Sequence, residues 1–135
     1  MSDFRKVTEE FSVAPQITIE DIAAAAAAGF SLIINNRPDG EDLDQPTNAQ
    51  MQAAALAAGL DYVFALVVGR PSRETAEVVR AAIEEADGPV LAYCRSGTRS
   101  INTWALGQAL SGQTPRDDLL SLGHGAGYDL TAILS

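Results

Sequence analysis

Short apolar runs alternate along this chain of 135 residues with longer segments that suit helices. The runs SLIIN, YVFALVV and VLAY have the length and the β-branched content of buried strands, and the opening FRKVTEEFSVA predicts a first strand or hairpin. Between and after them lie helical segments, predicted from 18, 48, 72, 100 and 114 onwards. This alternation predicts an α/β fold, one domain over residues 1–135, with a mainly parallel central sheet flanked by helices.

Polar and glycine residues mark where these helices begin and end. Thr18 and Ser72 stand at positions that cap a helix start, and Gly29 and Gly59 follow two helices directly. Thr114 is the predicted cap of the last helix, with a proline in its first turn. In a parallel sheet the loops that leave the carboxyl ends of the strands gather at one edge. We therefore expect the loops 36–46, 68–72 and 94–99 to meet there.

The charge balance limits the partners. Nine basic against eighteen acidic residues give a net charge of −9, which argues against nucleic acid or an anionic membrane. No apolar run approaches the roughly 20 residues that span a bilayer. The opening MSDFRKVTEEF does not read as a signal peptide, and a lone cysteine suits a reducing compartment, so we expect a cytoplasmic protein. With one histidine and no ligand cluster, neither a metal nor a cofactor is predicted.

The stretch PVLAYCRSGTRS carries the candidate chemistry. A strand, a short loop with a glycine and a helix form an anion-binding cradle of backbone N–H groups, which also favours a thiolate. Cys94 is the candidate nucleophile, Arg99 is placed to return over the bound anion, and Ser100 to donate a hydrogen bond to the sulfur. The predicted anion-binding residues are Arg95, Ser96, Gly97 and Thr98.

Other interpretations of these residues stay open. A cysteine that ends a buried strand is often only a small hydrophobic residue, although RSGTRS directly after it favours a reactive thiol. Arg37 and Arg70, in the neighbouring loops, are accessory candidates for steering an anion or plain surface arginines. Asp39 is a candidate general acid, but Pro-Asp-Gly is also a strong turn signal without any chemistry.

Several separated motifs resemble known families. CRSGTRS resembles the active-site loop of rhodanese-type sulfurtransferases, and VLAYC with its arginine resembles cysteine-dependent tyrosine and dual-specificity phosphatases. Together with FSVAPQIT, GFSLIINNRPDGE and GLDYVFALVV, they make the chain similar, over roughly residues 4–130, to the phosphatase-like domain family of beta-lactamase-hydrolase-like proteins. The resemblance implies a cysteine-phosphatase-like fold, with a rhodanese-like fold as second choice. It leaves open whether phosphate or sulfur is transferred.

Two details of the sequence favour sulfur. The phosphatase signature has five residues between cysteine and arginine, whereas Arg99 follows Cys94 after four and position 100 is serine. The shorter loop suits a persulfide better than a phosphoryl group with three oxygens. The preceding loop, VVGRPSRE, also lacks an aspartate to protonate a leaving alcohol. Sulfur transfer between thiols needs no such acid.

Three functions follow, in this order. The first is a sulfurtransferase that moves sulfane sulfur from thiosulfate or glutathione persulfide to a thiol or cyanide through a Cys94 persulfide. The alternative is a phosphatase-like hydrolase that acts through a Cys94 phosphocysteine. The third is a non-catalytic module that binds an anion or a partner. The expected substrate is a small sulfur or phosphate anion, and the expected partner is a persulfide dioxygenase or another sulfur-oxidising enzyme.

Overall fold

A five-stranded sheet forms the centre of the computed structural model, which describes residues 2–135. The strands are β1 (Arg5–Thr8), β2 (Phe11–Ala14), β3 (Leu32–Asn35), β4 (Asp61–Phe64) and β5 (Val90–Tyr93). The helices are α1 (Ile19–Ala27), α2 (Asn48–Ala57), α3 (Arg73–Glu85), α4 (Thr98–Ser111) and α5 (Arg116–Gly125).

The strand order is β1-β2-β5-β3-β4, and all neighbours except β1 and β2 are parallel. This arrangement confirms the predicted mainly parallel sheet, and the antiparallel β1–β2 pair confirms the opening hairpin. The last strand in the chain, β5, lies in the middle of the sheet, between β2 and β3. The residues that follow β5 are therefore surrounded by the ends of other strands.

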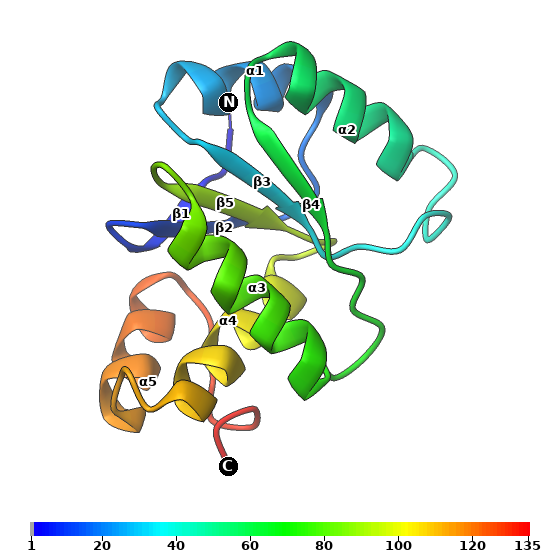
Figure 1. Cartoon of the computed structure of the whole chain (residues 1–135). Helices are drawn as coiled ribbons and strands as arrows, with labels where there is room; N and C mark the ends of the chain where they lie inside the picture. Colours follow the sequence, from blue (N-terminus) through cyan, green and yellow to red (C-terminus); the bar gives the residue numbers. More distant parts are fainter. Residues whose placement is uncertain (1) are drawn as a thin grey trace.

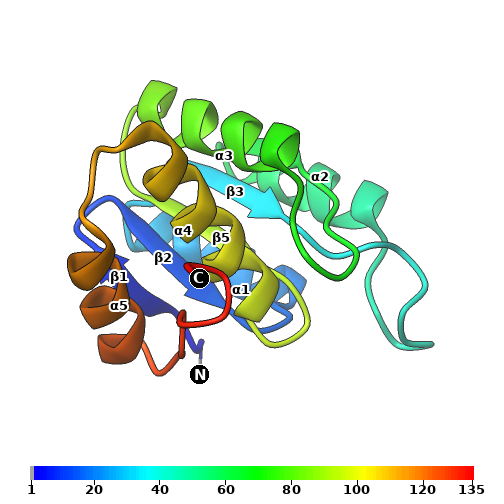
Figure 2. The same cartoon turned by 90° about the horizontal axis from the view of Figure 1, so that it is seen from below.

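Helices cover both faces of the sheet, with α1 and α2 on one side and α3, α4 and α5 on the other (Figures 1 and 2). Alternate side chains of β5 point to opposite faces of the sheet, as the two-residue period of a strand requires. Val90 and Ala92 belong to the core under α3, α4 and α5, whereas Leu91 and Tyr93 belong to the core under α1 and α2. All four are buried, which explains the uninterrupted apolar run VLAY.

The predicted helix caps are confirmed at two of three positions. The Thr18 side chain accepts a hydrogen bond from the Asp21 N–H, and that of Ser72 accepts one from the Thr75 N–H. The Thr114 cap is wrong, because α5 begins one residue later, with Pro115 at its cap position. Proline has no side-chain acceptor, so this helix start has no side-chain cap.

The predicted strand at 62–68 is also only partly correct, because the regular ladder ends at Phe64. The Ala65 N–H bonds to the Asn35 carbonyl, but the next inward N–H, of Val67, bonds to the carbonyl of Asn36. The segment after β4 thus advances by two residues where the segment after β3 advances by one. The regular parallel pairing ends at this point. The apolar composition continues past this point, which is why the pattern overextends the strand.

Candidate active site

The loop after β5 (residues 94–99, the cysteine loop) lies at the carboxyl edge of the sheet, in its centre. Cys94 is fully buried, and its Sγ accepts a hydrogen bond from the Gly97 N–H over 3.1 Å. Gly97 has a φ of +91°, which turns the chain into α4, whose first residue is Thr98. The thiol therefore lies beside the N-terminus of a fourteen-residue helix, where backbone N–H groups and the helix dipole favour an anion.

A tyrosine from the C-terminal segment supports this loop from outside. The Tyr128 hydroxyl donates to the Ser96 carbonyl over 2.8 Å and accepts from Arg5 Nη1 over 3.0 Å. A Cβ on Gly97 would lie only 2.1 Å from the Tyr128 hydroxyl oxygen, so the fit leaves no room for a side chain. No motif in the sequence marks Tyr128, and the sequence analysis missed it.

A second missed residue, Glu41, joins two of the predicted arginines. Both its oxygens accept from Arg99, over 2.7 and 2.9 Å, and the oxygen at 2.7 Å also accepts from Arg37 Nε over 2.8 Å. Hydrogen bonds from Arg99, and then from Arg37, lower the pKa of Glu41 to about 2. Arg99 also donates to the Val67 carbonyl over 3.0 Å. Arg99 thus joins the cysteine loop to the predicted loop 36–46, through Glu41, and to Val67, the residue directly before the predicted loop 68–72.

The other arginines have different environments. Arg37 is no surface residue: its side chain is 2 % exposed, and its guanidinium donates to Gln16, Glu41 and Asp42. Arg95 is 66 % exposed and comes no closer than 3.9 Å to Asp42. The exposed Arg70 forms no ion pair within residues 2–135. Arg95 is thus an exposed cation of the cysteine loop, while Arg37 joins its own loop to Gln16, in the segment after β2.

Two predicted roles are not found in this geometry. Ser100 is buried, but its hydroxyl has no hydrogen-bond partner among the described residues, so the predicted bond to the Cys94 sulfur is absent. The exposed Asp39 accepts a 2.7 Å hydrogen bond from the Asn48 N–H, at the first residue of α2. That contact agrees with the turn interpretation of Asp39 better than with a general acid.

Ser96 and Thr98 occupy the exposed rim of the cysteine loop, where the Ser96 hydroxyl donates to the Thr98 hydroxyl over 2.9 Å. A cavity of about 350 Å³ adjoins the cysteine loop at Arg95. It is lined by Gln16, Ile17, Thr18, Arg37, Asp42, Asp44, Gln45, Pro46 and Arg95. Arg95 belongs to both the lining of this cavity and the cysteine loop, so a ligand in the cavity lies next to the loop.

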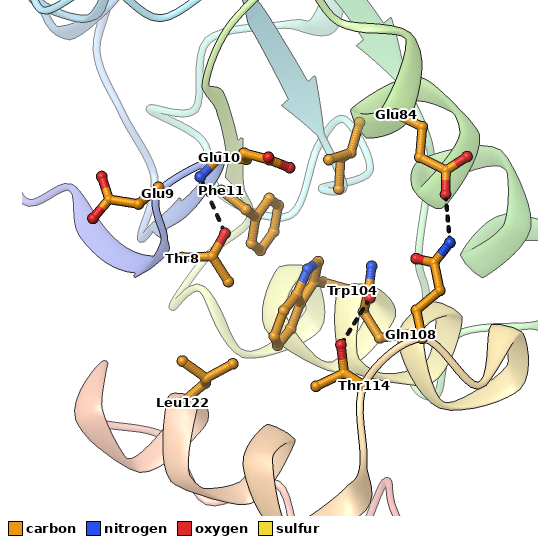
Figure 3. Close-up of a pocket in the computed structure, with 11 residues that line it drawn as sticks. Thr8, Glu9, Glu10, Phe11, Glu84, Trp104, Gln108, Thr114 and Leu122 are labelled. Atoms are coloured by element: carbon orange, nitrogen blue, oxygen red, sulfur yellow. Dashed lines mark hydrogen bonds between the residues drawn. The ribbon is translucent and has the colours of Figure 1, made fainter.

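Another cavity, of about 330 Å³, lies at the opposite end of the strands (Figure 3). Phe11 pairs with Val90, the first residue of β5, whereas Cys94 follows the last. The stacked rings of Phe11 and Trp104 line this cavity together with Glu10 and Glu84. It holds none of the predicted site residues.

Within residues 2–135, no three histidine, cysteine or acidic side chains gather in a way that could bind a metal ion. None of the described helices is long and apolar enough to cross a bilayer.

The fold and the buried cysteine at its central loop define a cysteine-phosphatase-like protein. Kinase associated phosphatase shares the fold, with a TM-score of 0.72 over 99% of this chain and 89% of that one, at 12% identity. The chain belongs to the family described as beta-lactamase hydrolase-like protein, phosphatase-like domain, whose model matches residues 3–111. These findings confirm the resemblance seen in the sequence.

Two closer relatives agree. A beta-lactamase hydrolase-like protein of Agrobacterium fabrum is 42% identical over 129 residues, 94% of this chain. The chain spans about 30% of the length of that relative. A crystal structure from Neisseria meningitidis, provisionally named a phosphatase, has a TM-score of 0.86 at 33% identity and covers 99% of this chain and 95% of its own. The comparisons thus favour the phosphatase alternative over the sulfurtransferase that the sequence analysis placed first.

Proposed function

We propose that this domain hydrolyses phosphate monoesters through a phosphocysteine at Cys94. The observation that carries the proposal is the Gly97 N–H directed at the buried Cys94 sulfur, at the N-terminus of α4. The proteins of this fold whose names describe them as phosphatases, including the relative from Neisseria meningitidis, support the same chemistry.

The reaction has two steps. The Cys94 thiolate attacks phosphorus, and the bond to the leaving oxygen breaks with its electron pair on that oxygen. Water then attacks the phosphocysteine, which releases inorganic phosphate and restores the thiolate. Loop N–H groups and the α4 N-terminus stabilise the charge on the phosphoryl oxygens in both steps. Arg99 is the last residue of the loop, and both its terminal nitrogens donate to Glu41. It can bind a phosphoryl oxygen when it gives up one or both of these hydrogen bonds.

The carboxyl groups around the site limit the substrates. Glu41 has a pKa of about 2 because of Arg99 and Arg37, so it carries no proton to give at neutral pH. Asp39 is engaged at the start of α2, and Asp42 pairs with Arg37. With none of these three carboxyl groups placed to protonate a leaving alcohol, we expect good turnover only for aryl phosphates, whose leaving groups need little protonation.

The test compares p-nitrophenyl phosphate hydrolysis by the wild type, Cys94→Ser and the surface control His124→Ala. We expect activity in the wild type and the control, none in Cys94→Ser, and one added phosphoryl group in the intact mass of the quenched wild type. Wild-type protein that neither turns over an aryl phosphate nor becomes phosphorylated contradicts the proposal.

Sulfur transfer is a second candidate because of two observations. Both terminal nitrogens of Arg99 are bonded to Glu41, and the loop is one residue shorter than the phosphatase signature, so the space for three phosphoryl oxygens is limited. Treatment with thiosulfate or glutathione persulfide, followed by measurement of the intact mass, distinguishes sulfur transfer from phosphate hydrolysis. A Cys94-dependent gain of one sulfur atom, without phosphorylation, favours transfer, with a sulfur-oxidising enzyme as its partner.

A further inference from the structure

The edge of the sheet formed by β4 and the segment after it carries exposed apolar side chains. Phe64, Leu66 and Val68 alternate along it, and their exposed fractions are 41, 47 and 74 %. From Asp61 to Val68 there is no lysine or proline, the residues with which proteins usually block a sheet edge. Figure 1 shows β4 at this edge, with α2 and α3 to either side of it.

Part of the backbone of this edge is unpaired as well. Ala65 and Val67 donate their N–H groups inward, to β3 and the residue after it, and their carbonyls accept from the side chains of Asn36 and Arg99. The N–H and carbonyl groups of Leu66 and Val68, in contrast, bond to nothing within residues 2–135. An added strand can satisfy both these groups and the apolar side chains beside them.

The geometry points to a second copy of this chain as the occupant: we propose that two β4 edges pair antiparallel about a two-fold axis at Leu66. Leu66 then faces its own copy, and Phe64 faces Val68. In this register Arg70 of one copy lies opposite Tyr62 of the other, the residue next to Asp61. Arg70 and Asp61 are both exposed and form no ion pair among the described residues, so the two ends of the edge are complementary in charge. An isologous interface of this kind is the commonest in homodimers.

Sedimentation or light scattering over a concentration series tests the pairing. We expect the wild type to reach the dimer mass, and Leu66→Lys to raise the dissociation constant at least about tenfold, because each dimer loses two leucines. Leu110→Lys, an exposed leucine at the end of α4, is the matched control and should dimerise like the wild type. Should Leu66→Lys fail to fold by circular dichroism, Val68→Lys replaces it.

Disulfide trapping locates the axis. Leu66→Cys in a Cys94→Ser background should form a covalent dimer on mild oxidation, because the two new thiols face each other. Val78→Cys, an exposed position on α3, should not do so in the same background. A monomeric wild type at every concentration, a dimer that Leu66→Lys leaves intact, or equal trapping at both positions overturns the proposal. None of these results depends on whether the domain is a phosphatase.

Discussion

Gly97→Ala is expected to destabilise the whole domain through a single contact between distant parts of the chain. Gly97 has a positive φ of +91°, and a Cβ there would lie 2.1 Å from the Tyr128 hydroxyl oxygen. The methyl group therefore both strains the backbone and expels the tyrosine. The tyrosine in turn loses its hydrogen bond to the Ser96 carbonyl.

The magnitude follows from these two parts. A non-glycine residue in the left-handed region costs about 1–2 kcal/mol. Loss of the hydrogen bond between Tyr128 and Ser96 costs about 1 kcal/mol more. We expect Gly97→Ala to lower the free energy of unfolding by about 2–3 kcal/mol, a large fraction of the stability of a domain of this size.

Equilibrium urea unfolding of four proteins measures this effect: wild type, Gly97→Ala, Tyr128→Phe and the double variant. Tyr128→Phe removes the oxygen that the new Cβ would strike, and the remaining ring carbon at 3.0 Å can be relieved by a small tilt of the ring. In that background Gly97→Ala should cost only the backbone strain, about 1–2 kcal/mol.

The expected signature is therefore a coupling of about 1 kcal/mol between the two substitutions. Equal costs of Gly97→Ala in both backgrounds would refute the close contact with Tyr128. A cost below about 0.5 kcal/mol in the wild-type background would refute the backbone strain as well.

Three further predictions concern the site and the helix starts. Arg99→Lys, which cannot replace the two-pronged contact with Glu41, should lower kcat/KM for an aryl phosphate at least about tenfold. The pKa of Glu41 is lowered from 4.5 to about 2. The ionised carboxylate therefore stabilises the fold fully above pH 4.5, and this stabilisation is lost as the pH falls towards 2. Over this range the urea midpoint of Glu41→Gln should fall less than that of the wild type. Thr47→Ala removes a capping box at α2 and should cost about 1 kcal/mol by urea unfolding, whereas the same change at Thr114, which caps no helix, should cost clearly less.

Features that depend on local patterns were predictable. The run Val90–Tyr93 is a buried strand because every one of its side chains has a core to enter, and the alternation of such runs with helices predicted the parallel sheet. The cysteine loop was found because its residue types and its place between strand and helix are local as well. The strand ending at Phe64 was overextended, because composition does not record a slip in pairing.

The sequence by itself determined the layers of this fold, the position of Cys94 at a strand end and the helix after it. Only the tertiary structure decided what surrounds them. Glu41 lies 58 residues before Arg99, and Tyr128 lies 32 residues after Ser96, yet both pairs are in contact. Such contacts depend on the order of the strands and on the packing of the C-terminal segment. The periodicity of single elements carries no information on either, because it records which face of an element is buried and not which element covers it.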